Sequence, residues 1–270
     1  MISKKKKLIR WLKVLILVYC TIGIALYYLQ EVFLFHPTKL PPEYVFHFNN
    51  RFEEMKVAVN KTDTLSFVKF YPSDSLTKGV VIYYHGNMKN IEHYSPYVKI
   101  FLNNGYEVWM GDYPGFGKTN GLRTEENMYH HARIIYGMAA AKYGSDSIII
   151  YGKSLGTGIA AYVASYSPAK ALVLETPYYS IPSLFSHYAF IYPVKSMSNY
   201  KIPAYQYIQE IKYPIIIFHG TGDDVIPYKN ARSLLPFLKP RDKFITIKDG
   251  GHNTLTHSPQ YAAVMDSLLR

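Results

Sequence analysis

The chain has 270 residues, 49% of them hydrophobic and 16% aromatic, which is enough for one large α/β domain or two small ones and excludes a disordered chain. The formal net charge is +11, but six of the 30 basic residues form an N-terminal group with no acidic residue among them: Lys4, Lys5, Lys6, Lys7, Arg10 and Lys13. The remaining 24 basic residues stand against 19 acidic ones. Without a basic stripe elsewhere, the sequence argues against a nucleic-acid-binding protein.

An apolar stretch, WLKVLILVYCTIGIALYYLQEVFLF, follows the basic group and is nearly continuous from Val14 to Leu29. About 20 residues of helix cross the hydrocarbon core of a bilayer, and aromatic side chains such as Trp11 favour its edges. We therefore predict a basic segment over residues 1–10 and a transmembrane anchor over residues 11–30.

A cleavable signal peptide is the competing interpretation of this stretch. Cleavage requires small residues just past the apolar core, whereas Leu26 to Phe35 is bulky. A lipoprotein signal is disfavoured because Tyr19, rather than a small residue, precedes Cys20. Since lysines precede the span and few follow it, we expect a single-pass protein with a cytoplasmic N-terminus and the domain that follows the span on the exported side. Cys20 is the only cysteine, so the chain can form no internal disulfide.

Residues 31–49 are rich in proline around Phe35–Tyr44 and lack periodicity, which predicts an extended linker before a domain at 50–270. Eight strand candidates then alternate, from the third onward, with segments of helical spacing. They are Met55–Val59, Ser66–Pro72, Gly79–Gly86, Tyr106–Tyr113, Ser147–Gly152, Lys170–Glu175, Tyr213–Gly220 and Lys243–Asp249. The pattern predicts an α/β domain whose eight-stranded sheet is mostly parallel, with helices on both faces and the first two strands antiparallel at one edge.

The segment from about 176 to 212 is longer than an ordinary connection and is rich in tyrosine, phenylalanine and proline. Two interpretations fit it: a short aromatic cap over the strand ends, or a crossover helix with an aromatic core face. If the segment is a cap, we expect its apolar and aromatic residues to line a pocket: Tyr178, Tyr179, Ile181, Leu184, Phe185, Tyr188, Phe190, Ile191 and Tyr192.

The letters GKS at Gly152–Ser154 end the phosphate-binding loop of nucleotide hydrolases, but they also belong to a second motif. The phosphate loop needs a glycine five residues before Gly152, where the chain has Ser147, and the residues between form a strand rather than a loop. G-x-S-x-G between a strand and a small-residue helix is the context of a nucleophile elbow. A plain helix-capping serine is the simpler alternative for Ser154.

Polar groups follow three of the predicted strands. Ser154 follows the fifth, Asp223 and Asp224 follow the seventh, and His252 follows the eighth. In open α/β sheets, sites gather beyond the carboxyl ends of the strands, and the order Ser, Asp, His is that of the α/β-hydrolase triad. Asp224 and Glu175 compete with Asp223 for the role of the acid.

With these motifs in place, the chain resembles α/β-hydrolase-fold serine hydrolases, in particular the single-pass membrane-anchored ABHD type. The resemblance rests on YYHGN (Tyr83–Asn87), GDYPGFGKTNG (Gly111–Gly121), GKSLGTG (Gly152–Gly158), ETPYYS (Glu175–Ser180), HGTGDDVIP (His219–Pro227) and GGHN (Gly250–Asn253). It implies that Ser154 is the nucleophile, Asp223 the acid and His252 the base. It covers the soluble region and says little about substrate.

An oxyanion hole must accompany such a nucleophile, because the tetrahedral intermediate needs preorganised donors. The N–H of Leu155, directly after the nucleophile, is one expected donor. The second should come from the loop after the third strand, with Asn87 preferred and Met88 the alternative.

For four other polar residues near the strand ends we expect solvent-exposed or structural roles rather than catalytic ones. We expect Lys153 to be solvated, Asp112 to fix a turn, and His85 and His219 to be structural. No close metal-ligand spacing such as H-E-x-x-H occurs, so we expect neither a metal nor a cofactor.

The sequence thus predicts a membrane-anchored hydrolase that cleaves carboxylic esters, including lipid esters or thioesters, through an acyl-enzyme. A serine aminopeptidase or peptidase on the same fold is one alternative. It would need a carboxylate for the free amine of its substrate, and residues 176–212 hold only Glu210. A non-catalytic binding protein is the other alternative.

Overall fold

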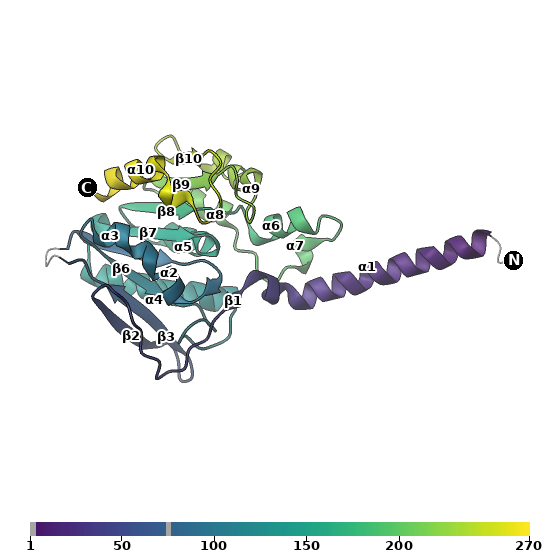
Figure 1. The fold of residues 1–270 in the computed structure, drawn as a ribbon, viewed down its shortest axis with the longest axis horizontal. Helices are drawn as coiled ribbons and strands as arrows, with labels where there is room; N and C mark the ends of the chain where they lie inside the picture. Colours follow the sequence, from purple (N-terminus) through teal and green to yellow (C-terminus); the bar gives the residue numbers. More distant parts are fainter. Residues whose placement is uncertain (1–3, 74–76) are drawn as a thin grey trace.

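A long N-terminal helix, α1 (Lys4–Leu34), projects from the side of an α/β domain (Figure 1). The computed structural model describes residues 4–73 and 77–270, so the start of the basic segment predicted at 1–10 lies outside the described residues. Within the described part of the chain, α1 is the helix long and apolar enough to cross a membrane, and its most apolar stretch is unburied. The helix continues past the predicted boundary at residue 30 up to the domain itself.

The domain is built on an eight-stranded sheet in the order β10-β9-β8-β7-β4-β6-β3-β2. Its strands are β2 (Phe52–Ala58), β3 (Thr64–Phe70), β4 (Gly79–Tyr84), β6 (Tyr106–Gly111), β7 (Ile148–Lys153), β8 (Ala171–Glu175), β9 (Ile215–Gly220) and β10 (Lys243–Ile247). At one edge, β3 pairs antiparallel with both β2 and β6, and the other neighbours run parallel. All eight predicted strands are present, and the fold class is confirmed.

Helices cover both faces of the sheet because its central strands are apolar on both sides. On β7, Ile148 and Ile150 point into one core and Ile149 and Tyr151 into the other. The first core is covered by α4 (Glu125–Lys142), α5 (Leu155–Tyr166) and α8 (Ala204–Glu210); the second by α2 (Ile91–Tyr94), α3 (Lys99–Leu102) and α10 (Pro259–Leu269). Shorter elements complete the domain: α9 (Tyr228–Arg232), η1 (Ser95–Val98), η2 (Ser145–Ser147), η3 (Leu235–Phe237) and η4 (Leu255–His257).

The segment expected to be a linker at 31–49 is packed against the domain, which corrects that expectation. Strand β1 (His36–Pro37) pairs in parallel with β5 (Met88–Lys89). Phe35 lies buried in the first core and Phe46 in the second. Burying two aromatic side chains is favourable enough to hold this proline-rich stretch on the protein surface. The end of α1 is therefore tied directly to the domain.

Residues 176–212 combine the two interpretations weighed for them. Helices α6 (Ile181–Tyr188) and α7 (Val194–Met197) lie beside the domain end of α1 (Figure 1). Helix α8, by contrast, packs on α5 with Ile208 buried in the first core. The first part of the segment is thus a cap and the last part a crossover helix.

Candidate active site

Ser154 lies at the turn between β7 and α5, in a backbone conformation that few residues adopt. Its φ is 52° and its ψ is −120°. Its backbone N–H donates to the carbonyl oxygen of Glu175 at 2.9 Å, and its own carbonyl accepts from Thr157 N at 2.9 Å. Non-glycine residues held at positive φ by their surroundings are concentrated at functional sites. The strand–turn–helix context predicted for Ser154 is present.

The two glycines of the motif allow the chain to pass close to its neighbours at this turn. A Cβ atom on Gly156 would lie 2.0 Å from the carbonyl oxygen of Tyr84, and one on Gly152 would lie 2.5 Å from the carbonyl oxygen of Gly156. Both clashes are with backbone atoms, which cannot rotate away. The sharp turn therefore requires glycine at both positions.

Loops after three strands bring the three predicted site residues into one hydrogen-bonded chain. His252 Nε2, on the loop after β10, lies 2.9 Å from Ser154 Oγ. His252 Nδ1 lies 2.8 Å from Oδ2 and 3.1 Å from Oδ1 of Asp223, which follows β9. With the Nδ1 proton donated to this carboxylate, Nε2 carries the lone pair that can accept the hydroxyl proton of Ser154.

The carboxylate of Asp223 is buried and well supplied with donors. Its Oδ1 atom accepts from the backbone N–H of Val225 at 2.9 Å and of Ile226 at 2.8 Å. Burial alone would raise the pKa of Asp223, but the hydrogen bond and charge of His252, together with the Ile226 N–H, lower it below its usual value. The neighbouring Asp224 is exposed. Of these two carboxylates, Asp223 is the one that contacts His252.

Lys153 is buried rather than solvated, which corrects the sequence expectation. It shares the second face of the sheet with Tyr151, and its ammonium group pairs with the carboxylate of Glu175, which also accepts from the Tyr151 hydroxyl. The ammonium also lies 5.0 Å from the centre of the Tyr97 ring. A buried lysine needs such a partner because an isolated charge is costly to desolvate. The carboxylate of Glu175 is thereby bound to Lys153 and Tyr151 rather than to His252.

The two predicted oxyanion donors lie beside Ser154. Leu155 is the first residue of α5, where backbone N–H groups have no partner inside the helix. Asn87 borders the same cavity as Ser154, but its side-chain amide donates to the carbonyl oxygen of Leu34 at 2.8 Å. With the side chain directed to Leu34, the donor that we expect from Asn87 is its backbone N–H. The alternative, Met88, donates its N–H to the hydroxyl of Tyr94 at 3.2 Å, which favours Asn87.

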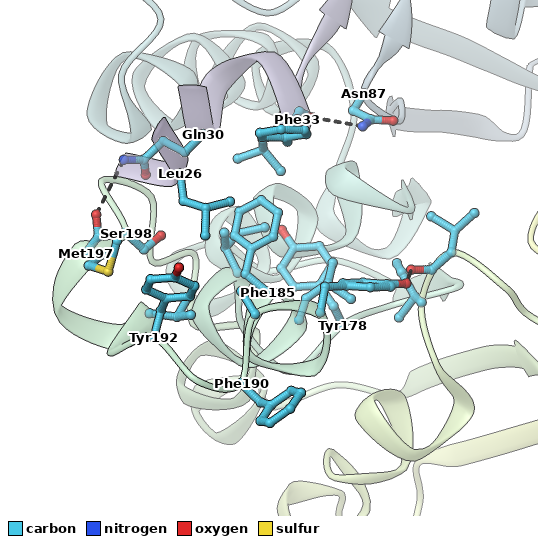
Figure 2. Close-up of a pocket in the computed structure, with 18 of the residues that line it drawn as sticks. Leu26, Gln30, Phe33, Asn87, Tyr178, Phe185, Phe190, Tyr192, Met197 and Ser198 are labelled. Atoms are coloured by element: carbon cyan, nitrogen blue, oxygen red, sulfur yellow. Dashed lines mark hydrogen bonds between the residues drawn. The ribbon is translucent and has the colours of Figure 1, made fainter. Parts of the chain in front are cut away.

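An apolar cavity of about 660 Å³ opens onto Ser154 and is walled by α1 and the cap (Figure 2). Its lining includes all the cap residues predicted for it except Tyr179, whose ring instead stacks on Tyr205 at 4.2 Å. Sequence reasoning missed the wall formed by α1. One signal for it was Gln30, which interrupts the apolar stretch of the helix and lies four positions from both Leu26 and Leu34.

The remaining polar residues near the strand ends connect loops. Asp112 accepts from the N–H of Ile91 at 3.0 Å and lies 3.3 Å from Nε2 of buried His85. Nε2 of His219 lies 2.9 Å from the carbonyl oxygen of Ile226. Across residues 4–73 and 77–270, no three His, Cys, Asp or Glu side chains are grouped as metal ligands would be.

The chain is similar to known proteins in both sequence and fold. A family model described as "Serine aminopeptidase, S33" matches residues 75–207. Lysophosphatidylserine lipase ABHD12 of Macaca fascicularis is 28% identical over 190 residues, covering 63% of this chain and 48% of the relative. Human protein ABHD12B is 27% identical over 207 residues, covering 67% and 57%. The chain thus spans about half the length of the curated relatives it matches.

Solved structures show the same architecture at low identity. An esterase from Pyrococcus furiosus superposes with a TM-score of 0.68 at 17% identity, covering 87% of this chain and 97% of that one. An α/β hydrolase from Vibrio vulnificus superposes with a TM-score of 0.65 at 18% identity, covering 80% and 81%. Fold, motifs and sequence similarity agree: the chain has the α/β-hydrolase fold and is similar to serine hydrolases of the ABHD type.

Proposed function

We propose that this chain is a membrane-anchored hydrolase that cleaves carboxylic esters of long acyl chains through an acyl-enzyme on Ser154. One observation carries the proposal. The hydrogen-bonded series Ser154–His252–Asp223 opens onto an apolar cavity rather than onto a polar surface. A serine hydroxyl becomes a competent nucleophile when a base accepts its proton, and an apolar cavity favours a hydrocarbon substrate.

The reaction follows from the positions of these groups. As Ser154 Oγ attacks the ester carbonyl carbon, its proton passes to His252 Nε2, and the charge of Asp223 stabilises the imidazolium. The N–H groups of Leu155 and Asn87 donate to the oxyanion of the tetrahedral intermediate. His252 then returns the proton to the leaving alkoxide as the ester C–O bond breaks. A water molecule, deprotonated by His252, attacks the acyl-enzyme and releases the carboxylic acid and free Ser154.

The composition of the cavity supports esters over aminopeptidase substrates, despite the name of the matching family model. An aminopeptidase needs a carboxylate to bind the free amine of its substrate. Among the described residues that line the cavity there is no aspartate or glutamate, and the polar groups are amides and hydroxyls such as Asn87, Gln30 and Ser198. A neutral, mainly apolar site suits an acyl chain better than an ammonium group.

The mammalian relatives named as lysophosphatidylserine lipases suggest a lipid with one acyl chain as substrate. A cavity of about 660 Å³ is of the size that proteins use for one elongated ligand. We therefore propose a monoacyl lipid ester as the substrate class of this chain.

The full chain in nanodiscs should be assayed with p-nitrophenyl esters from acetyl to decanoyl and with aminoacyl p-nitroanilides. Each additional buried methylene contributes up to about 0.8 kcal/mol, or about fourfold in kcat/KM. We expect kcat/KM to rise with chain length and the anilides to be poor substrates. A flat or falling profile beyond butyryl, or faster cleavage of anilides than of any ester, would refute the proposal.

A further inference from the structure

We infer that α1 is part of the active site as well as an anchor: its C-terminal half forms a wall of the acyl-binding cavity, and the cavity opens between α1 and the cap into a lipid leaflet, from which the substrate enters. This inference rests on the proposed function, because it assigns the route and the position of the acyl chain in the same site.

One face of α1 lines the cavity along several turns. The lining residues recur at helical spacing and are Ile22, Leu26, Gln30, Phe33 and Leu34. At 1.5 Å per residue, this face is about 18 Å long. At one end of this face, the carbonyl oxygen of Leu34 accepts a hydrogen bond from the side chain of Asn87, which lies beside Ser154. Leu26 and Tyr192 lie at the other side of the cavity (Figure 2). An acyl chain on Ser154 can therefore extend along α1.

Reciprocal contacts hold α1 against the cap. The rings of Tyr19 and Tyr192 stack with centroids 4.6 Å apart and an interplanar angle of 11°. The Tyr19 hydroxyl donates to Ile191 O, and the Tyr192 hydroxyl donates to Tyr19 O, each at 3.1 Å. A Cβ atom on Gly23 would lie 3.1 Å from the Tyr192 ring. The small residue at position 23 allows the ring to approach the helix closely.

Polar residues near the end of α1 complete the attachment. Gln30 is buried, donating to Met197 O at 3.4 Å and accepting from Asn199 N at 2.7 Å. The next residue, Glu31, pairs with Arg123 at 3.0 Å. These partners belong to the domain and its cap, so the orientation of α1 about its own axis is specified.

The contact at Tyr19 places the cap tip at membrane depth. Tyr19 lies 11 residues before Gln30, about 16 Å along the helix, whereas the whole hydrocarbon core is about 30 Å thick. A span over residues 11–30 therefore carries the cap tip, Ala189–Tyr192, into one leaflet. Its side chains match that environment: Phe190 is 80% exposed and Ile191 58% exposed. Both residues also line the cavity, so the mouth of the cavity lies at the depth of the acyl chains in that leaflet.

The direction of the cavity matches that of a lipid in the leaflet. Ser154 is at the end of the cavity near Leu34, where α1 leaves the membrane, and the cavity extends from there toward Ile22, deeper in the bilayer. A lipid has its ester at the interface and its acyl chain directed toward the bilayer centre. A monoacyl lipid can thus move sideways into the cavity without its chain crossing water, where each exposed methylene is unfavourable.

A pair of tryptophan variants tests the wall. Leu26 lines the cavity, whereas Ile24 lies on the opposite side of α1 and is 60% exposed. In nanodiscs, Leu26→Trp should lower kcat/KM for a dodecanoyl ester about tenfold, the effect of losing about two buried methylenes, and leave a butyryl ester nearly unchanged. Ile24→Trp should change neither. Equal losses of kcat/KM on both esters, or no loss on the dodecanoyl ester, would overturn the inference that α1 forms a wall of the acyl-binding cavity.

Spin labelling tests the leaflet contact without relying on turnover. Cys20 is the only cysteine, so a Cys20→Ala background accepts one label at Phe190→Cys, with exposed Tyr166→Cys at the end of α5 as the control. In nanodiscs we expect oxygen to relax the label at 190 more than a water-soluble nickel chelate does, with the opposite result at 166. Preferential relaxation by nickel at 190 would overturn the leaflet entry. Absence of wild-type ester hydrolysis with oxygen-accessible 190 would instead count against the proposed function alone.

Discussion

Asp223 contacts His252 Nδ1 with both carboxylate oxygens, at 2.8 and 3.1 Å, while Asp224, the next residue, is exposed. We predict that Asp223→Asn lowers kcat by about 10⁴-fold, because the amide would donate to Nδ1, force the proton onto Nε2 and leave it unable to accept from Ser154. Asp224→Asn is the matched control and should stay within a few-fold of wild type. Ester hydrolysis by the two purified variants measures the difference. If Asp224→Asn were the more damaged enzyme, the assignment of the acid would be wrong.

The buried pair of Lys153 and Glu175 gives a stability prediction. Lys153→Met alone leaves a carboxylate buried without its cation and should cost about 3–5 kcal/mol. In Lys153→Met/Glu175→Gln no uncompensated charge remains, and the amide oxygen can still accept from Tyr151, so most of the loss should be recovered. Denaturant unfolding of the two variants measures both changes. A double variant less stable than Lys153→Met would show that the pair is not energetically coupled in this way.

Gly156, at the turn after Ser154, should not tolerate a methyl group. Gly156→Ala would place Cβ 2.0 Å from the carbonyl oxygen of Tyr84, so we expect a loss of at least about 2 kcal/mol and a fall in activity. Gly137→Ala is the control, since its Cβ in α4 meets nothing within 4 Å; it should stabilise the fold by about 0.5–1 kcal/mol. Thermal unfolding measures both. Equal effects of the two changes would contradict the close packing at Gly156.

Membrane orientation is a separate prediction, based on the basic residues that precede the span, Lys4–Lys7, Arg10 and Lys13. A reporter fused after Arg270 should behave as exported, and the chain should resist carbonate extraction. Cytoplasmic reporter activity from a chain that still resists extraction would overturn the orientation.

Much of the fold could be predicted because its strands are short apolar runs of regular spacing. The strand predicted at Ser147–Gly152 forms at Ile148–Lys153, a shift of one residue. The proximity of Ser154 and His252 also followed from the sequence, since the carboxyl ends of parallel strands meet at one edge. Their chemical roles remain predictions.

The features that sequence reasoning missed depend on contacts between distant segments. Lys153 is buried because its partner, Glu175, lies on the neighbouring strand, 22 residues away. The wall formed by α1 depends on the docking of Tyr19 against Tyr192, 173 residues apart. The local sequence around each residue does not identify its distant partner.

The identity of the nucleophile is tested most directly by reacting the full chain with a fluorophosphonate probe and locating the adduct by peptide mass spectrometry. We expect one adduct, on Ser154, and no labelling of Ser154→Ala, whose thermal unfolding should match wild type because only one oxygen is removed from the site. Labelling of Ser154→Ala at the wild-type rate, or an adduct on another residue while Ser154 stays unmodified, would contradict the role of Ser154.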